Sequence, residues 1–189
     1  MSMSIQETPE YQRLSAELEE MRALRRRVPL SEPECRYIGD PPGKSLALAY
    51  AEQFPRTKTG AGISLPVFCA AIPLNSGRRV QNYLVSDLLE QLGDRDAAKR
   101  EDITLKSFRF IKLLRQYGVE LVILTDVHHL TTPGGTKLLH DQFDWIKWVF
   151  KSELQNVALL LVGEIEILEQ LIDANVQFSR LLDPIHLGE

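Results

Sequence analysis

The sequence predicts an α/β fold in which helices cover both faces of a parallel β-sheet. From residue 34 onward, strand-length apolar runs alternate with segments of helical periodicity. Three of these runs, at residues 65–73, 119–126 and 156–163, are apolar almost throughout. Such runs are typical of strands buried on both faces, and their alternation with amphipathic helices indicates a doubly wound sheet.

The first predicted element is a helix over residues 9–28. Its apolar residues recur at steps of three and four, which places them on one helical face: Leu14, Leu18, Met21, Leu24 and Val28. Pro29 and Pro33 then end the helix and favour an extended connection. We therefore predict a helical extension at residues 1–32 and a core domain at residues 33–189.

The same patterns assign the remaining elements of the core. A further strand is predicted at residues 34–39, and a last short one at 183–189. Apolar periodicity predicts helices at residues 44–54, 78–93, 105–118, 136–154 and 164–175. The glycine- and threonine-rich segment 56–64 indicates a surface loop.

Composition narrows the class of protein. The chain has 189 residues, 44% of them hydrophobic and 25% charged, so it can bury one ordinary core. Its 22 basic and 26 acidic residues give a net charge of -4, so nucleic-acid binding requires a local basic patch. We expect a reduced, cytoplasmic protein without a membrane segment, because both cysteines lie in apolar runs and no signal-peptide core or membrane-length apolar run is present.

The segment "YIGDPPGKSLALAYAEQF", residues 37–54, has the character of a phosphate-binding loop that leads into a helix. In such loops, backbone N–H groups, a lysine and the helix N-terminus surround the phosphates, while a Ser or Thr hydroxyl binds Mg²⁺. Here a Gly-Lys-Ser sequence follows a predicted strand and opens a predicted helix, as the motif requires. The predicted nucleotide-contacting residues are Gly39, Gly43, Lys44, Ser45 and Leu46.

This loop is one residue shorter than the usual G-x-x-x-x-G-K-[ST] pattern, because only three residues separate Gly39 from Gly43. Pro42 also stands where an N–H would face the β-phosphate, and proline has no N–H. The sequence therefore predicts a nucleotide site with a missing donor and weakened affinity. The alternative is a Gly-Pro turn that precedes Lys-Ser by coincidence.

A second feature is the acidic residue that ends the strand at 119–126. In P-loop ATPases such a strand carries an Asp that orders Mg²⁺ and then a Glu that polarises the attacking water. Here Thr125-Asp126 stands in that place. If Asp126 corresponds to the Asp of this pair, it acts on the metal. If it corresponds to the Glu, it replaces the base and Thr125 replaces the metal-binding residue. A structural Asp that caps the following segment is the alternative, but the end of a parallel strand favours a site.

Two further features are not predicted to carry chemistry. Glu164 follows the strand at 156–163, where its charge would repel phosphate but suit a helix N-terminus. His128 and His129 could form a metal site together with His140 or Cys35. However, adjacent histidines at a strand exit are expected to point apart, and no pair of these residues has zinc-finger spacing. We therefore predict no metal site at the two histidines.

Taken together, residues 36–188 resemble the AAA+ core of the TniB and TnsC family of transposition regulators. The resemblance rests on "YIGDPPGKSLALAYA", "GVELVILTDVHHL", "HDQFDWIKWVF" and "LLLVGEIEILEQLIDANVQFSRLLDPIHL". It implies a P-loop NTPase of the AAA+ class that uses ATP and Mg²⁺. It also implies assembly on DNA as a ring or filament, and contacts with a transposase and a target-selection protein.

Residue by residue, the resemblance implies Lys44 and Ser45 on the phosphates and Mg²⁺, and Asp126 on the metal or the water. Arg180 matches the arginine that reaches a neighbouring subunit's nucleotide. Contacts to the DNA backbone, which position the protein without reading sequence, are implied for four residues: Asn75, Ser76, Arg78 and Arg79.

The sequence also departs from the family pattern. The phosphate loop is short, the Asp-Glu pair is reduced, and the sequence ends at Glu189, where a helical lid would follow. These departures make ATP turnover an open question and suggest a truncated, regulatory member. The first hypothesis is an ATP-binding regulator of DNA transposition. Its rivals are a non-hydrolysing module that joins or blocks assemblies of intact family members, and an ATPase resembling helicase loaders.

Overall fold

The computed structural model describes residues 4–27, 34–60, 62–74, 81–131, 136–154, 156–173 and 179–187. Within them, five parallel strands form one sheet in the order β4-β5-β6-β1-β7. The strands are β1 (Cys35–Gly39), β4 (Val67–Ala71), β5 (Leu121–Thr125), β6 (Ala158–Gly163) and β7 (Leu182–Pro184). The predicted parallel sheet is therefore confirmed, with strand bounds within a few residues of those expected.

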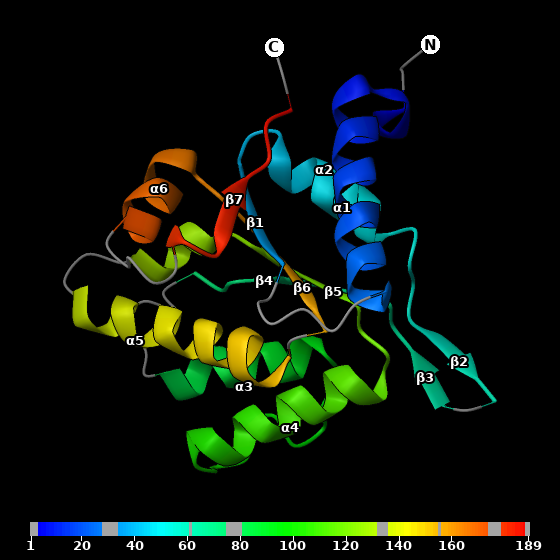
Figure 1. Ribbon diagram of the computed structural model, residues 1–189. Coiled ribbons are helices and arrows are strands. Elements are labelled where there is room, and N and C mark those ends of the chain that lie inside the picture. Colours follow the sequence, from blue (N-terminus) through cyan, green and yellow to red (C-terminus); the bar gives the residue numbers. More distant parts are fainter. Residues whose placement is uncertain are drawn as a thin grey trace.

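In the described part of the chain, six α-helices cover the sheet (Figure 1). They are α1 (Pro9–Arg27), α2 (Gly43–Ala51), α3 (Gln81–Gln91), α4 (Ile103–Gln116), α5 (Thr136–Trp148) and α6 (Ile165–Asp173). Helices α1 and α2 lie on one face, and α3 to α6 contribute to the core on the other face. The predicted helices on both faces are therefore confirmed among the described residues.

The side chains of β5 show why its first four residues, 121–124, are all apolar. Leu121 and Ile123 pack into the cluster formed with α1 and α2, whereas Val122 and Leu124 pack into the cluster on the opposite face. All four are at most 1% exposed. Alternate residues of a strand point to opposite faces, so a strand covered on both faces must be apolar at every position.

Helix α1 packs directly on the sheet rather than standing apart from it. Its residues Leu14, Leu18 and Met21 are fully buried, as the helical stripe predicted. The division into an extension at 1–32 and a core at 33–189 stays a prediction, but α1 contributes to the same hydrophobic cluster as α2.

A buried arginine fixes α1 to its neighbours. Arg22 is 3% exposed and its guanidinium donates to Glu120 at 2.7 and 3.0 Å, to Glu19 at 2.8 Å and to the Tyr50 hydroxyl at 3.0 Å. The same group lies 4.1 Å from the centre of the Phe54 ring. A buried charge requires such partners, so these contacts hold the end of α1 against α2 and the start of β5.

The segment 56–64 differs from the expected loop. It contains an antiparallel pair, β2 (Thr57–Thr59) and β3 (Gly62–Ser64), that projects from the molecule beside α1 (Figure 1). Thr57 pairs with Ser64 and Thr59 with Gly62. The β-branched side chains of the two threonines favour strand pairing over an irregular loop. The segment is exposed or half-buried, as a surface position requires.

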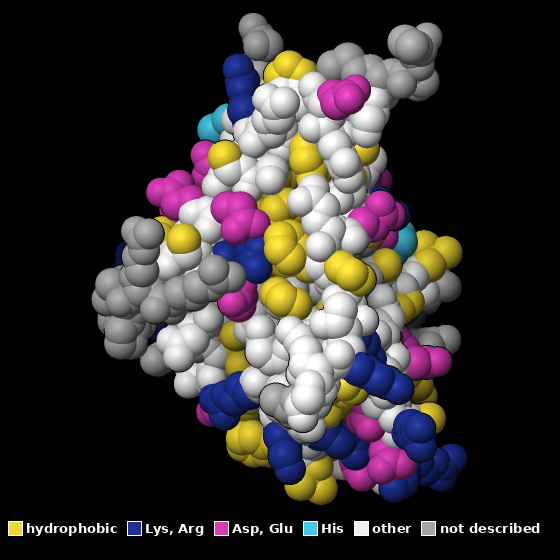
Figure 2. Space-filling view, turned by 90° about the vertical axis from the view of Figure 1, so that its right-hand side faces the viewer, with side chains coloured by type: hydrophobic (Ala, Val, Ile, Leu, Met, Phe, Trp, Pro, Cys, Tyr) yellow, Lys and Arg dark blue, Asp and Glu magenta, His cyan; other side chains and the backbone are white. Residues whose placement is uncertain are grey.

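Figure 2 shows one face of the molecule, with Lys and Arg side chains gathered toward its lower half among acidic ones. A single extended basic surface is not visible on this face. This distribution agrees with the net charge of -4 and with the expectation that DNA contact requires a local patch. No helix among the described residues is long and apolar enough to cross a membrane.

The strand order determines where chemistry can occur. Strand β6 lies between β1 and β5, and Gly39 at the end of β1 pairs with Gly163 at the end of β6. The carboxyl ends of these strands therefore meet at one edge of the sheet. In open α/β sheets, ligands bind outside this edge, close to the point where successive connections run in opposite directions.

Candidate phosphate-binding site

Both ends of the loop between β1 and α2 lie against neighbouring strands, the start against β6 and the end against β1. The Asp40 N–H donates to the Gly163 carbonyl at 2.9 Å, which extends the contact between β1 and β6. Gly43 begins α2, and a Cβ at this position would lie 3.1 Å from Ile38 Cγ2. Glycine therefore lets the N-terminus of α2 lie directly against β1.

The N-terminus of α2 already holds an anionic group from the chain itself. The backbone N–H of Lys44 donates to Asp40 Oδ1 at 3.2 Å. Helix N-termini attract anions because their first N–H groups have no partner within the helix and the dipole is positive there. The Asp40 carboxylate thus lies at the N-terminus of this nine-residue helix, at the place where the motif predicts phosphate.

The Lys44 side chain reaches from α2 to the end of β5. Its Nζ lies 2.7 Å from Asp126 Oδ1, which joins the two features that the sequence singled out separately. The Thr125 hydroxyl donates to the other oxygen, Asp126 Oδ2, at 3.1 Å. Lys44 is half-buried and Asp126 is 9% exposed, so the pair is partly shielded from water.

The pKa of Asp126 lies below its usual value. Burial acts to raise this pKa, but the hydrogen bond and charge of Lys44, the Thr125 hydroxyl and the charge of His129 together outweigh it. Asp126 therefore carries its negative charge at neutral pH. Its φ of 57° is in the left-handed region, which Asn and Asp adopt more easily than most other residues.

We expect Asp126→Asn to lower the free energy of unfolding at pH 7 by about 1–2 kcal/mol, because solvent at the 39%-exposed Lys44 reduces the about 1.5–3 kcal/mol of a hydrogen bond to a charged group. Because the folded pKa is depressed, this stabilisation is present above the unfolded pKa of about 3.9 and is lost as pH falls through the folded pKa. Urea unfolding of both proteins at pH 7 and near pH 3 should show the difference shrink at acid pH. An equal difference at both pH values would contradict the Lys44–Asp126 ion pair.

The remaining predicted loop residues lie where α2 begins. The Ser45 hydroxyl is exposed and donates to the Pro42 carbonyl at 2.9 Å. The Leu46 side chain is buried in the cluster with α1, so only its backbone faces the loop. The roles of Gly39, Ser45 and Leu46 in nucleotide binding stay predictions.

A hollow of about 450 Å³ opens beside the loop. Three isoleucines line it together with loop residues and the end of the described chain: Ile38, Gly39, Asp40, Pro41, Ile165, Ile185, His186 and Leu187. The hollow adjoins the N-terminus of α2 through Asp40, which lines it and also accepts the Lys44 N–H. The hollow is therefore mainly apolar and lies next to the N-terminus of α2.

Arg180 does not join this site within the subunit. It is exposed and precedes β7, whose Leu182 pairs with Cys35 at the start of β1. Arg180 therefore lies at the amino end of the parallel strands, and Lys44 follows their carboxyl ends. Its predicted role toward a neighbouring subunit stays a prediction. The four predicted DNA-contacting residues lie outside the described residues: Asn75, Ser76, Arg78 and Arg79.

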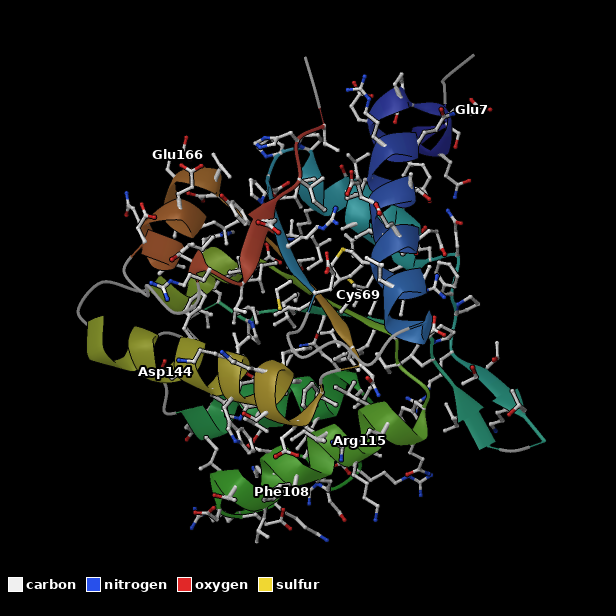
Figure 3. All side chains as sticks on the ribbon, in the orientation of Figure 1. Glu7, Cys69, Phe108, Arg115, Asp144 and Glu166 are labelled. Carbon is white, nitrogen blue, oxygen red and sulfur yellow. The ribbon has the colours of Figure 1, made fainter. Side chains whose placement is uncertain are left out.

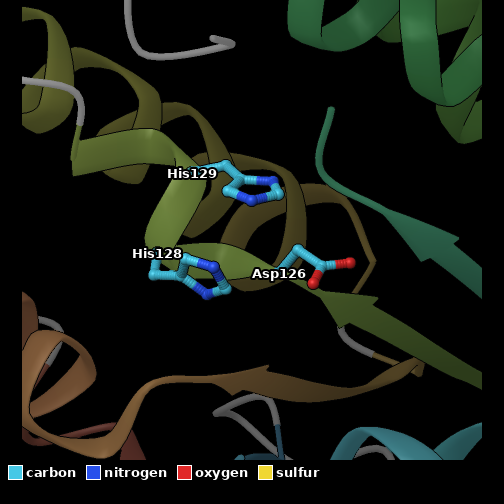
Figure 4. Close-up of side chains that lie close together, drawn as sticks. All are labelled: Asp126, His128 and His129. Atoms are coloured by element: carbon cyan, nitrogen blue, oxygen red, sulfur yellow. The ribbon is translucent and has the colours of Figure 1, made fainter. Parts of the chain in front are cut away.

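The prediction that the adjacent histidines point apart is wrong. They lie in a 3-10 helix, η3 (Val127–Thr131), and their ring centres are only 4.4 Å apart. The chain turns directly after Asp126 rather than continuing as an extended strand, so alternation of side chains no longer applies. Figure 4 shows both rings close to the Asp126 carboxylate.

Cys69 is a half-buried residue of β4 (Figure 3). Burial and, to a smaller extent, the Asp126 charge raise the pKa of its thiol to about 11, although the Lys44 charge acts in the opposite direction. The thiol is therefore protonated at neutral pH, and a protonated buried thiol is a poor nucleophile.

Comparison with known proteins agrees with this architecture. Among solved structures, 21 chains match, including the Walker-type ATPase PABY2304 of Pyrococcus abyssi. The two chains share 13% sequence identity with a TM-score of 0.61, over 97% of this chain and 52% of that one. The chain thus spans about half the length of that protein, and the likeness confirms a P-loop NTPase-like α/β fold.

Sequence families give a more specific result. No curated protein matches the chain. A family model does match: the TniB family, described as "Bacterial TniB protein", matches residues 2–189. This range includes α1, the phosphate loop, the strand that ends before Asp126, and β7. Because the match extends over nearly the whole chain, the protein belongs to the TniB family.

Proposed function

We propose that this protein is an ATP-binding AAA+ regulator of DNA transposition that assembles on DNA and links a target site to a transposase. Membership of the TniB family supports the transposition role. The observation that carries the nucleotide part is the 2.7 Å contact between Lys44 Nζ and Asp126 beside the N-terminus of α2. It joins a cation, a carboxylate and a helix dipole at the ligand-binding edge of a P-loop fold.

In this proposal, phosphate binding exchanges contacts that the chain already makes. A phosphate oxygen replaces the Asp40 carboxylate at the Lys44 backbone N–H, and the Lys44 ammonium turns from Asp126 toward the phosphates. Both exchanges replace one anionic oxygen by another, so the site needs no new fold element. The apolar hollow lined by Ile38, Ile165 and Ile185 then receives the base.

The donor set also fits Mg²⁺. When Lys44 turns to the phosphates, the 9%-exposed Asp126 carboxylate loses its cation, and a buried carboxylate requires a new one. Asp126 and the Ser45 hydroxyl would hold the ion, which neutralises phosphate charge when bound. For hydrolysis, Asp126 acts on the metal or on the attacking water, and Arg180 acts on a neighbouring subunit's nucleotide.

Specific contacts favour a second function, a non-hydrolysing interaction module. Pro41 and Pro42 supply no N–H to the loop, and the Ser45 hydroxyl is bonded to the Pro42 carbonyl. Thr125 stands where an Asp-Glu pair would supply a second carboxylate. In this function the chain joins or blocks assemblies of intact family members without turning over ATP.

The proposed regulator should assemble on double-stranded DNA only with a nucleoside triphosphate. Sedimentation with DNA at fixed salt should give large complexes with a non-hydrolysable ATP analogue, and markedly smaller ones without nucleotide. Arg78→Ala/Arg79→Ala should weaken this assembly and flatten its salt dependence, because each phosphate contact releases counterions.

The matched control is Lys99→Ala/Arg100→Ala, which removes the same charge from an exposed pair elsewhere. Its assembly should fall less than that of the Arg78/Arg79 variant. DNA assembly that does not depend on nucleotide would refute the regulator function. Nucleotide-free binding to an intact family member, without DNA assembly, would identify the interaction module instead.

A further inference from the structure

Three potential metal ligands converge at the end of β5. One ligand atom each from Asp126, His128 and His129 lies within 4.8 Å of the other two. Asp126 and His129 are joined by the hydrogen bond from the His129 N–H to the Asp126 carbonyl at 2.9 Å. Residues three apart lie on the same side of a 3-10 turn, so the local backbone brings the carboxylate and this imidazole together.

A neighbouring strand orients one of the imidazoles. His129 Nδ1 lies 2.7 Å from the Ile72 carbonyl, which directly follows β4. A carbonyl oxygen can only accept, so Nδ1 carries a hydrogen, and in the neutral form of this imidazole Nε2 carries the lone pair. Metal-binding histidines are commonly held in this way, with one nitrogen donating to a backbone carbonyl and the other facing the ion.

A fourth potential ligand, the carboxylate of Glu164, lies near His128. Glu164 Oε1 is 3.8 Å from His128 Nε2, and its side chain is 56% exposed. The His128 side chain is 20% exposed and that of Asp126 is 11% exposed, so the cluster is open to solvent on the Glu164 side. Two imidazoles with one or two carboxylates form the ligand set of zinc and related first-row metals, whereas Mg²⁺ prefers oxygen ligands alone.

We propose that Asp126, His128 and His129 form a binding site for a divalent first-row transition-metal ion such as Zn²⁺ in the nucleotide-free protein. A tetrahedral ion with bonds of about 2 Å holds its ligand atoms about 3.3 Å apart. Side-chain rotations that contract the cluster by up to about 1.5 Å therefore suffice to form the site. The site differs from the proposed Mg²⁺ site in using imidazole nitrogens, and it requires no nucleotide.

Lys44 opposes this ion, because its ammonium lies 2.7 Å from Asp126 Oδ1. The ammonium and the metal ion would share the Asp126 carboxylate. The metal ion would be on Asp126 Oδ2, the oxygen that also accepts from the Thr125 hydroxyl. Removal of the ammonium should therefore strengthen metal binding, by about tenfold from the Coulomb repulsion at a partly shielded site. Lys44→Ala is expected to weaken nucleotide binding, so the two sites respond to this variant in opposite directions.

Cobalt(II) provides a direct test, because its visible absorption bands report nitrogen and oxygen ligation. The full chain, free of nucleotide, should give saturable bands as Co²⁺ is added, and Zn²⁺ should displace them. His128→Gln and His129→Gln should each weaken Co²⁺ binding at least about tenfold. His186→Gln, a histidine outside the cluster, should leave binding unchanged.

Circular dichroism of each variant separates loss of a ligand from loss of the fold. The Lys44→Ala variant provides a test that needs no loss of binding, because its Co²⁺ affinity should rise. Absent bands at millimolar Co²⁺ would overturn the proposal, as would bands that survive both histidine substitutions. Neither result would touch the proposed function, because ATP binding is measured separately with Mg²⁺ and does not use the two histidines.

Discussion

Replacement of Lys44 by alanine is expected to weaken Mg·ATP binding by at least about 100-fold, which corresponds to the loss of one strong charge-assisted contact. Lys44 supplies two donors to the candidate site: its ammonium, which lies 2.7 Å from Asp126, and its backbone N–H, which faces Asp40. Alanine keeps the N–H and removes the ammonium, so the variant isolates the contribution of the side chain. Displacement of a fluorescent ATP analogue gives the change in affinity.

The matched control is Lys58→Ala, which removes an exposed lysine from β2. Its ATP affinity should equal that of the unaltered protein. Lys44→Ala leaves the Asp126 carboxylate without its ammonium partner, so urea unfolding must accompany the measurement to show that the variant is folded. Equal ATP affinity in the folded Lys44→Ala variant and the unaltered protein would exclude Lys44 from the site.

Asp40→Asn is expected to have the opposite effect and to tighten Mg·ATP binding by about tenfold. The Asp40 carboxylate accepts the Lys44 N–H at 3.2 Å, and it competes with phosphate for the N-terminus of α2. Its negative charge also repels the triphosphate. Asparagine removes the charge but keeps an oxygen that can accept the same hydrogen bond, so the loop retains its contact in the nucleotide-free state.

A second aspartate offers a close control for this variant. Asp102 caps α4, and its Oδ1 accepts the Thr104 N–H at 2.7 Å, so the chemistry resembles that of Asp40 at another helix. Asp102→Asn should leave ATP affinity unchanged. If Asp40→Asn weakens binding instead, the carboxylate assists the nucleotide and does not compete with it.

The fold was predictable from sequence because its signals are repeated and local. The first four residues of β5 are apolar, since both faces of the strand are buried, and this pattern separates a covered parallel strand from a half-exposed one. The helix stripe of α1 likewise predicted its buried face. The hairpin at 57–64 was missed because short, exposed strands carry little apolar periodicity.

The candidate site was predictable only in part. The motif identified Lys44, and the strand end identified Asp126, but the pattern could not show that the two side chains meet 2.7 Å apart across 82 residues of chain. Asp40 was overlooked because a carboxylate in a phosphate loop has no place in the motif. Its position four residues before the lysine, directly ahead of a helix, was the available signal. The close approach of the His128 and His129 rings could not be predicted without the geometry of the turn that follows Asp126.

The central claim is that this TniB-family chain binds a nucleoside triphosphate at the N-terminus of α2. Calorimetric titration of the unaltered protein with Mg·ATP tests it most directly. The account predicts saturable binding of one nucleotide per chain, weaker than that of an intact phosphate loop because Pro41 and Pro42 supply no N–H. No binding at millimolar Mg·ATP would contradict the account and leave the interaction module as the function to pursue.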